Sequence, residues 1–271
     1  MLYRAHNTAG PAANVGGVSA DLELALQLAD AADALSLAPF RSGIAFETKP
    51  DLTPVTEADR AVETRIRALL EDARPGDAVL GEEEGYRGAG ARRWIVDPID
   101  GTRNYARGVP IWATLIALEE AGTVSLGVVS APALGRRWWA ERDDGAYADG
   151  ERIGVSAIAR IEDAVVSLAY EHALPDLARR AWHVRGFGDF WAHMLVAEGA
   201  VDAAVDATGV NEWDLAAVQV IVEEACGRFS DYRGVSRIDG GAAVTSNGLL
   251  HAELLDALAA RDGRAANPVL R

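Results

Sequence analysis

The sequence predicts an α/β fold in which helices and β-sheets form layers, and three observations support this prediction. Short apolar, partly β-branched runs such as Trp94–Val96 have the composition of buried strands. Other segments place apolar residues three or four positions apart, as helices that cover one face of a sheet do. Turn-linked strands dominate the first half, which favours a mostly antiparallel sheet, whereas strands and helices alternate after about Ile153.

Size and composition limit the class of protein. The chain has 271 residues, 49% hydrophobic and 25% charged, which suits one large globular domain or two closely packed halves. Its net charge is −15 and its pI about 4.7, so its surface should repel nucleic acid and anionic membranes and attract metal cations. The single cysteine, Cys226, excludes an internal disulfide. Because we find neither a transmembrane-length apolar run nor a signal-peptide pattern, we expect a cytoplasmic protein without membrane or nucleic-acid partners.

The first elements are expected to serve packing. Residues 1–18 lack periodicity and should form a flexible N-terminal extension that activity does not require. Ser19 is a suitable N-cap for a helix that continues to about Phe40, and residues 44–49 could form a short strand.

The next helix has a clear start signal. Thr56 is followed three residues later by Asp59, which is the pattern of a capping box, and Pro75-Gly76 ends the helix. The Asp59 carboxylate has a structural role in such a cap. It could also face a site on its other side, and the local pattern leaves both possibilities open.

A glutamate-rich segment follows the short apolar run at residues 78–80. The triple glutamate in Gly81-Glu82-Glu83-Glu84-Gly85 is most simply a solvated face, because runs of like charge usually face water. At the end of a strand, and shortly before the next carboxylates, it is also a suitable source of one metal ligand. Residues 85–90 are expected to form a flexible loop.

The strand at Trp94–Val96 leads directly into Asp97-Pro98-Ile99-Asp100. Both carboxylates and the Ile99 carbonyl could turn to one side, because the proline between the aspartates has a fixed φ. Oxygen ligands of this kind suit Mg²⁺ or Mn²⁺ better than zinc.

Gly101 and Thr102 come next, where a helical turn is expected to begin. Their backbone N–H groups can point at an anion, and Thr102 adds a hydroxyl beside the carboxylates. A plain structural turn is the alternative interpretation of this segment, since Asp-Pro and Asp-Gly pairs are common in turns.

The middle of the chain predicts further strands and one hairpin. Trp138 and Trp139 are expected to serve packing or subunit contacts rather than ligand binding. The predicted strands cover residues 112–118, 123–129 and 137–141, with Asp143-Asp144-Gly145 as a hairpin turn.

The second half adds strands, helices and one more acidic position. Asn211-Glu212-Trp213-Asp214 opens a strongly patterned apolar helix that Gly227 ends. Asp214 in the first turn could merely complement the helix dipole, which is frequent. The other predicted elements are strands at 165–169, 183–187, 201–206 and 242–245, and helices at 176–182, 189–198 and from Asn247.

Four motifs together resemble one known family. Thr56-x-x-Asp59, Gly81-Glu82-Glu83, Asp97–Thr102 and Trp213-Asp214 have the order and approximate spacing found in the metal-dependent, lithium-sensitive inositol monophosphatase family, over roughly residues 20–260. Within it, several stretches are similar to the actinobacterial-type histidinol-phosphate phosphatases. These stretches are Lys49–Thr56, Gly108–Ala113, Val128–Leu134, Gly188–Phe190 and Leu195–Asp202.

The resemblance implies a fold and a reaction. The fold would be an alternating αβαβα sandwich with an antiparallel N-terminal sheet and a smaller, mixed C-terminal sheet. Residues 19–152 would carry most metal ligands, and residues 153–271 would carry Asp214 and the substrate contacts. The reaction would be Mg²⁺-dependent hydrolysis of L-histidinol phosphate to L-histidinol and phosphate, in an enzyme that commonly forms homodimers.

The resemblance also implies a ligand set. Glu82, Asp97 and the Ile99 carbonyl would hold one Mg²⁺, and Asp97, Asp100 and Asp214 would hold a second. Glu82 would help to hold a third, weaker one, and Mn²⁺ is a possible substitute.

Further residues would act on water and substrate. Asp59 and Thr102 would orient the nucleophilic water and, with Glu82 from the metal ligands, form the catalytic set. The amides of Gly101 and Thr102 would receive the phosphate. Arg185 and the segment Gly188-Asp189 match the part of the family that reaches the alcohol side of the substrate.

Substrate choice needs an extra charge. Histidinol phosphate carries an ammonium that inositol phosphate lacks, so its site should contain an additional carboxylate. Asp189 is our hypothesis for this role, with Asp206 or Glu212 in reserve. The alternative is that Asp189 is a surface residue that caps a helix.

Four other functions are alternatives to this interpretation. A haloacid-dehalogenase-type phosphatase needs its two aspartates two positions apart, whereas Asp97 and Asp100 are three apart. A histidine-rich metallophosphatase is disfavoured, because the five histidines show no metal-ligand spacing. Hydrolysis of inositol-1-phosphate or fructose-1,6-bisphosphate would use the same fold and metals. A non-catalytic, metal-binding regulatory module would not need Thr102 and Asp59.

Overall fold

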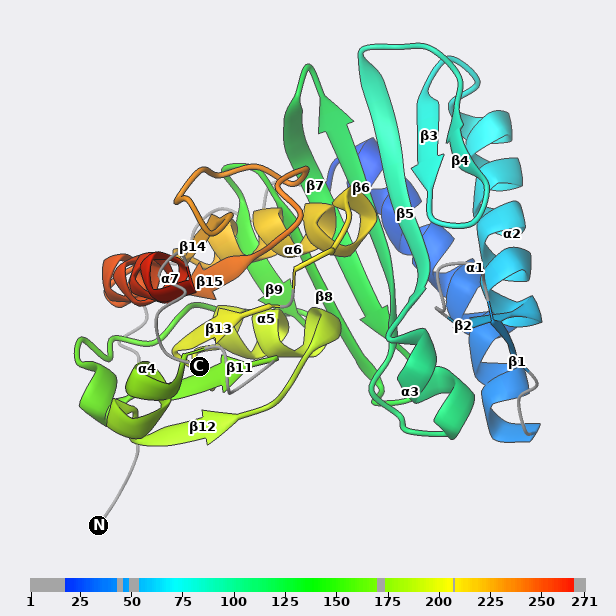
Figure 1. The fold of residues 1–271 in the computed structure, drawn as a ribbon. Coiled ribbons are helices and arrows are strands. Elements are labelled where there is room, and N and C mark those ends of the chain that lie inside the picture. Colours follow the sequence, from blue (N-terminus) through cyan, green and yellow to red (C-terminus); the bar gives the residue numbers. More distant parts are fainter. Residues whose placement is uncertain (1–17, 43–45, 49–53, 170–173, 207, 266–271) are drawn as a thin grey trace.

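The computed structural model describes residues 18–42, 46–48, 54–169, 174–206 and 208–265. Five layers of helices and sheets alternate in it, as the family resemblance implies (Figure 1). The helices are α1 (Ala20–Ser42), α2 (Glu57–Ala73), α3 (Thr102–Arg107), α4 (Pro175–Arg180), α5 (Asp189–Ala197), α6 (Glu212–Glu224) and α7 (His251–Ala265). No helix of the described chain is long and apolar enough to cross a membrane.

The larger sheet has eight strands in the order β10-β9-β8-β7-β6-β5-β3-β4. Every neighbouring pair is antiparallel except β3 and β5, which confirms the mostly antiparallel sheet expected for the first half. Its strands are β3 (Ala78–Gly81), β4 (Gly85–Arg87), β5 (Arg92–Asp100), β6 (Ala113–Glu120), β7 (Thr123–Ala131), β8 (Arg136–Glu141), β9 (Gly145–Ala148) and β10 (Glu151–Arg152).

The smaller sheet is mixed. Its five strands have the order β12-β11-β13-β15-β14, in which β11 runs parallel to β12 and β13 while β15 runs antiparallel to β13 and β14. They are β11 (Val165–Leu168), β12 (His183–Arg185), β13 (Ala203–Val205), β14 (Arg228–Ser230) and β15 (Val244–Ser246). A separate two-stranded ribbon pairs β1 (Phe46–Thr48) with β2 (Pro54–Thr56).

Alternate residues of β5 face different helix layers. Trp94 and Val96 pack in the apolar cluster formed with α1 and α2, whereas Ile95 packs in the cluster formed with α5 and α6. Burial on both faces explains why this strand is a continuous apolar run. The end of β5 therefore lies between helix layers, and the acidic segment follows there.

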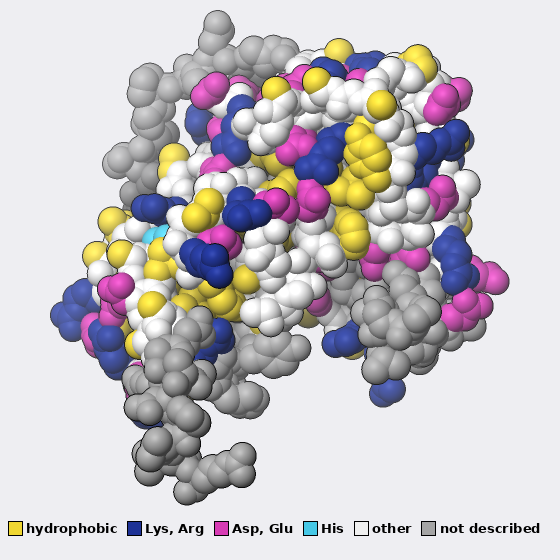
Figure 2. Space-filling model, turned by 45° about the horizontal axis from the view of Figure 1, so that its top comes forward, with side chains coloured by type: hydrophobic (Ala, Val, Ile, Leu, Met, Phe, Trp, Pro, Cys, Tyr) yellow, Lys and Arg dark blue, Asp and Glu magenta, His cyan; other side chains and the backbone are white. Residues whose placement is uncertain are grey.

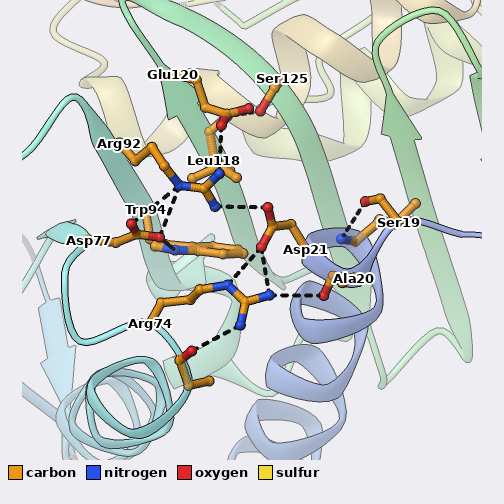
Figure 3. A network of polar contacts seen from close by, with 12 residues as sticks. Ser19, Ala20, Asp21, Arg74, Asp77, Arg92, Trp94, Leu118, Glu120 and Ser125 are labelled. Atoms are coloured by element: carbon orange, nitrogen blue, oxygen red, sulfur yellow. Dashed lines mark hydrogen bonds and ion pairs between the residues drawn. The ribbon is translucent and has the colours of Figure 1, made fainter.

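A network of charges joins the first turn of α1 to the end of α2 and the start of β5 (Figure 3). Arg92 contacts Asp77, Asp21 and Glu120, and Asp21 also accepts from Arg74. These side chains are partly exposed, so each pair contributes only about 0–1 kcal/mol. The network therefore links α1, α2 and the sheet at the surface, while the apolar cluster beneath it packs these elements together.

The surface mixes both signs of charge. Figure 2 shows basic and acidic side chains interspersed over the face turned toward the viewer, with apolar groups between them. On the described part of this face, the excess negative charge is therefore distributed rather than gathered into one patch.

Most predicted elements are present. The helix from Ser19, the capping box at Thr56, the strands of the middle segment and the alternating elements of the second half are confirmed with small shifts in their ends. β5 is longer than the predicted strand, because it continues to Asp100 by pairing with β6 across an irregular register. β14 was not predicted, since three residues are too few to show a period.

One interpretation is corrected, and another is narrowed to a single role. Residues 85–87 were expected to lie in a flexible loop but form the edge strand β4, which pairs with β3 through a tight turn at Glu82–Glu84. Glycines at both ends of a short polar segment do not distinguish such a strand from a loop. Trp138 is fully buried against Phe190 and Trp191, so it serves packing, which is one of the two roles expected for it.

Some expectations stay predictions. Residues 1–17 of the expected extension and 49–53 of the family-like stretch lie outside the described residues. β10 ends the larger sheet at Arg152, and every strand of the smaller sheet follows it in the chain. The division into 19–152 and 153–271 is compatible with this order.

Candidate active site

A pocket of about 310 Å³ lies where β5 ends and α3, α5 and α6 begin. Four segments that are distant in the sequence contribute to it. Its lining residues are Glu82, Asp97, Ile99, Asp100, Gly101, Thr102, Arg103, Asn104, Asp189 and Asp214.

Three carboxylates meet in this pocket. Asp97, Asp100 and Asp214 each offer an oxygen, and these oxygens all lie within 4.8 Å of one another. Asp97 and Asp100 are buried at the end of β5, and Asp214 is half-buried in the first turn of α6. We call these three residues the acidic cluster.

Backbone N–H groups hold each carboxylate of the acidic cluster in place. Such bonds to a charged acceptor are stronger than neutral ones and keep the side chains in one orientation. The donors are Ile99 to Asp97 (3.0 Å), Phe190 to Asp100 (2.6 Å) and Asn211 to Asp214 (2.5 Å).

Burial raises the pKa of all three carboxyl groups. The pKa values of Asp97 and Asp100 lie well above their usual range, first because of burial and then because neighbouring carboxylates repel their charge. Burial raises the pKa of Asp214 to about 7, and Glu82 and Asp206 add to the effect. A bound cation would remove this repulsion.

The donor set fits a hard divalent cation. All the converging donors are oxygens, and the Ile99 carbonyl accepts from the Thr102 hydroxyl at 2.9 Å while keeping a second lone pair. Glu82 lines the same pocket from the turn between β3 and β4, and its charge acts on Asp97 and Asp214. The residues present therefore match the requirements of Mg²⁺ or Mn²⁺.

Asp59 combines its two possible roles. Its Oδ2 accepts from the backbone N–H (2.8 Å) and hydroxyl (2.5 Å) of Thr56, which completes the cap of α2. Its Oδ1 lies 3.4 Å from the hydroxyl of Thr102 at the pocket. Burial raises the pKa of Asp59, although Thr56 opposes this.

Gly101 allows the chain to turn from β5 into α3. Its φ is +81°, a conformation that other residues rarely adopt. A Cβ at this position would lie 3.1 Å from the carbonyl oxygen of Ile111 and 3.4 Å from Oδ2 of Asp189. A side chain here would thus be strained and would crowd the pocket.

Asp189 is the first residue of α5 and directs its carboxylate to the pocket. Its φ of +55° is uncommon for a residue other than glycine, and Gly188 before it is the N-cap. Asp189 is accessible from the pocket, where its Oδ2 lies 3.4 Å from Nδ2 of Asn104. The protein atoms around it, and then the charge of Asp206, raise its pKa to about 6.

The remaining predicted substrate residues are not among the described residues that line this pocket. Asp206 is half-buried, and its Oδ2 lies 3.3 Å from Nε2 of the buried His193. Arg185 is exposed on β12, an edge strand, and does not line the pocket in the described chain. Glu212 forms an ion pair with Arg93, which already occupies its carboxylate.

Two pocket residues were not predicted from the sequence. Arg103 and Asn104 lie in the first turn of α3 and line the pocket beside Gly101 and Thr102. Asn104 also donates to the carbonyl of Ile111 at 2.9 Å. The only signal for them in the sequence was their place directly after the Asp97–Thr102 motif.

One known family matches most of the chain. The Inositol monophosphatase family matches residues 19–264, which is most of the chain. The chain belongs to the inositol monophosphatase family. This family is metal-dependent, and the buried acidic cluster is consistent with metal binding.

The alignments of this family member with its curated relatives cover nearly the whole length of those relatives. It is 52% identical to the histidinol-phosphatase of Mycobacterium tuberculosis over 257 residues, or 88% of this chain and 97% of the relative. It is 48% identical to the histidinol-phosphatase of Streptomyces coelicolor over 256 residues, which are 87% of this chain and 95% of the relative.

Solved structures confirm the layered fold. An IMPase from Thermotoga maritima superposes with a TM-score of 0.82 and 32% identity over 90% of this chain and 98% of the other. The extragenic suppressor protein suhB from Bartonella henselae superposes with a TM-score of 0.82 and 30% identity, over 89% of this chain and 98% of the other.

Proposed function

We propose that this inositol monophosphatase family member is a Mg²⁺-dependent phosphomonoesterase that hydrolyses L-histidinol phosphate to L-histidinol and phosphate. The observation that carries the reaction is the Asp59–Thr102 pair beside the acidic cluster, because a protein that only binds metal has no need of it. The substrate rests on the two relatives named histidinol-phosphatase, at 52% and 48% identity.

A phosphate monoester is slow to hydrolyse, since its charge repels nucleophiles and its alkoxide leaves poorly. Two or three Mg²⁺ ions, which Mn²⁺ could replace, would supply a water of lowered pKa and neutralise charge on the phosphate and leaving oxygen. The oxygens of the acidic cluster, the Glu82 carboxylate and the Ile99 carbonyl would hold them.

Asp59 and Thr102 would orient the attacking water. A hydroxyl has one proton, so Thr102 can donate to either the Ile99 carbonyl or Asp59 Oδ1 at one time. When it donates to Asp59, its lone pairs can accept from a water, whose oxygen is then directed into the pocket. The raised pKa of Asp59 makes that carboxylate a better proton acceptor than an exposed aspartate.

The start of α3 would receive the phosphate. The first N–H groups of a helix have no acceptor within the helix, and those of Gly101 and Thr102 lie at the pocket. The turn at Gly101 leaves room for an anion at these groups, because no Cβ stands there.

The alcohol side would recognise the ammonium of histidinol. Asp189 borders the pocket, and Asp206 lies near enough to raise its pKa. A bound ammonium would favour the charged form of Asp189 and offset this repulsion. Arg185 and Gly188 are proposed to complete this side, and Glu212 is the weakest candidate because it pairs with Arg93.

Phosphate release from L-histidinol phosphate, with Mg²⁺ and with EDTA, tests the reaction. We expect turnover with Mg²⁺ and none with EDTA, and loss of turnover in Thr102→Ala. Mg²⁺ binding without turnover on any small phosphomonoester would favour the regulatory-module alternative.

The Asp189→Asn variant tests the substrate. We expect KM for L-histidinol phosphate to rise about 10- to 100-fold, the value of one charged hydrogen bond, with little change for inositol-1-phosphate. Asp72→Asn, at an exposed position of α2, is the matched control. An unchanged preference between the two substrates would remove Asp189 from this role.

Inositol-1-phosphate hydrolysis is the second candidate. A fructose-1,6-bisphosphatase/inositol-1-monophosphatase from Thermotoga maritima is 36% identical over 208 residues, so this relative supports inositol-1-phosphate less strongly than the histidinol-phosphatases support L-histidinol phosphate.

The homodimer and the cytoplasmic location remain predictions.

A further inference from the structure

We propose that Glu63, in the middle of α2, is a positioning residue that clamps the turn at Glu82–Glu84 and thereby fixes the direction of the Glu82 carboxylate. This inference rests on the proposed metal-binding role of Glu82. Glu63 itself touches neither the pocket lining nor the acidic cluster in any described contact, so it would act through the turn.

The carboxylate of Glu63 is fully buried and accepts two backbone bonds from the turn. Its Oε2 accepts from the N–H of Glu83 at 2.7 Å, and its Oε1 accepts from the N–H of Glu84 at 2.9 Å. These are the two residues that follow Glu82. Both bonds have a charged acceptor, so they are stronger than ordinary backbone bonds.

The other side of Glu82 is fixed as well. Its own N–H donates to the carbonyl of Val96 on β5 at 3.2 Å, which continues the pairing of β3 with the strand that carries Asp97. Glu82 is therefore held between β5 before it and the Glu63 carboxylate after it. A side chain at such a position keeps one direction relative to β5.

Gly81 makes the close approach of the carboxylate possible. A Cβ on Gly81 would lie 2.2 Å from Oε1 of Glu63, which no real contact allows. The glycine before the glutamates thus has a physical purpose, since it leaves room for a side chain from another element.

Arg67 completes the clamp. Its Nε donates to Oε1 of Glu63 at 2.9 Å, and its Nη2 donates to the carbonyl of Gly85 at 2.5 Å. The clamp therefore holds the turn at its amides and at the carbonyl that follows.

Stability alone does not explain a buried ion pair here. Removing two charges from water costs several kcal/mol each, and apolar residues of similar size often give equal or greater stability. A carboxylate at this position does what an apolar side chain cannot, because it accepts from two N–H groups of a turn that has no strand partner for them.

Two residues of α2 then contribute to the site. Asp59 in its first turn contacts Thr102, and Glu63 follows four residues later, one helical turn on. The helix thus positions both the residue that would orient water and the turn that would supply a metal ligand.

The test compares Glu63→Gln with Glu71→Gln, an exposed glutamate on the same helix. Glutamine presents an amide NH₂ to one of the two N–H groups, so one bond of the clamp is lost. In the metal-free protein, we expect about tenfold faster hydrogen exchange in a peptide covering residues 81–87. We also expect Mn²⁺ affinity, measured by electron paramagnetic resonance, to fall about 10- to 100-fold, with a matching rise in the Mg²⁺ concentration for half-maximal activity. Glu71→Gln should change none of these.

A purely structural role would lower the melting temperature without moving metal affinity, and that result would overturn the inference. Unchanged exchange in the turn would also overturn it. If Glu63→Gln does not fold, Glu63→Asp decides instead, because its shorter side chain keeps the charge but cannot reach both amides. A wild-type protein that binds neither ion and releases no phosphate would overturn the proposed function together with this inference, whereas an active wild type with unaltered variants overturns this inference alone.

Discussion

The backbone N–H of Phe190 donates to Oδ2 of Asp100 at 2.6 Å, across 90 positions of the chain. This bond joins the first turn of α5 to the end of β5. Asp189 directly precedes Phe190, so the contact that holds a carboxylate of the acidic cluster also places the carboxylate proposed to bind the ammonium. This hydrogen bond therefore helps to position the acidic cluster relative to the proposed alcohol side of the site.

Asp100→Asn should lower kcat by about 100-fold or more, because it removes one negative charge from the proposed Mg²⁺ ligands. The fold should persist, since the asparagine oxygen can still accept from Phe190. Steady-state phosphate release and circular dichroism measure the two effects. Asp143→Asn, in an exposed hairpin turn with φ of +66°, is a control that asparagine tolerates well. Near-wild-type turnover of Asp100→Asn would contradict the metal assignment.

Stability without metal should fall as pH rises toward neutrality. Asp214 has a pKa of about 7 in the folded protein against 3.8 as its ordinary value, so the folded state binds more protons than the unfolded chain between these limits. Its contribution is fully present below about pH 4 and is lost as pH rises through about 7. Mg²⁺ should therefore raise the melting temperature more at about pH 8 than at about pH 5.5, where protons already neutralise the cluster. Thermal unfolding with Mg²⁺ and with EDTA measures this, and Asp214→Asn should reduce the difference. Equal increments at both pH values would argue against the acidic cluster as the metal site.

Arg103→Ala should raise KM for a phosphomonoester about three- to tenfold while changing kcat little. In the described chain, Arg103 is the one cationic residue that lines the pocket, and its charge acts on Asp189. It would attract a dianionic substrate toward a site rich in carboxylates. Arg107→Ala, an exposed arginine in the last turn of the same helix, is the control. If both variants show the same KM, Arg103 has no part in substrate capture.

His251 should make the protein less stable in mild acid. Its ring nitrogens contact the hydroxyls of Ser230 and Ser246, and burial lowers its pKa from 6.5 to about 4. The unfolded chain then binds the extra proton, so stability is full above about pH 6.5 and is lost as pH falls toward 4. The loss between pH 7.5 and 5 amounts to at most about 2 kcal/mol, reduced by solvent screening. Urea unfolding in saturating Mg²⁺ measures it, and His251→Gln should show a shallower dependence over this range. A variant with the wild-type slope would assign the acid sensitivity to other groups.

The sequence was most informative where local patterns carry the signal. The capping box of Thr56 and Asp59, the apolar run before Asp97 and the acidic first turn of α6 are short-range patterns, and the structure places all three as expected. The family resemblance supplied the layered arrangement, which local patterns alone do not determine.

Features that depend on distant contacts were not predictable in this way. The proposed role of Glu63 depends on backbone amides 20 and 21 positions away in the sequence. Asn104 contacts Asp189, which is 85 positions away. β4 is a strand because β3 lies beside it, and Trp138 is buried because α5 covers it. Periodicity reports which face of an element is apolar, not what packs on that face.

The most direct test of the account is the ratio of kcat/KM for L-histidinol phosphate to that for myo-inositol-1-phosphate, measured in parallel with Mg²⁺ and with EDTA. We predict a Mg²⁺-dependent ratio of about 100 or more in favour of L-histidinol phosphate, because the charged pocket carboxylates bind an ammonium that inositol phosphate lacks. Comparable values for the two substrates, or a preference for inositol phosphate, would contradict the proposed substrate and leave only the family and its metal-dependent chemistry.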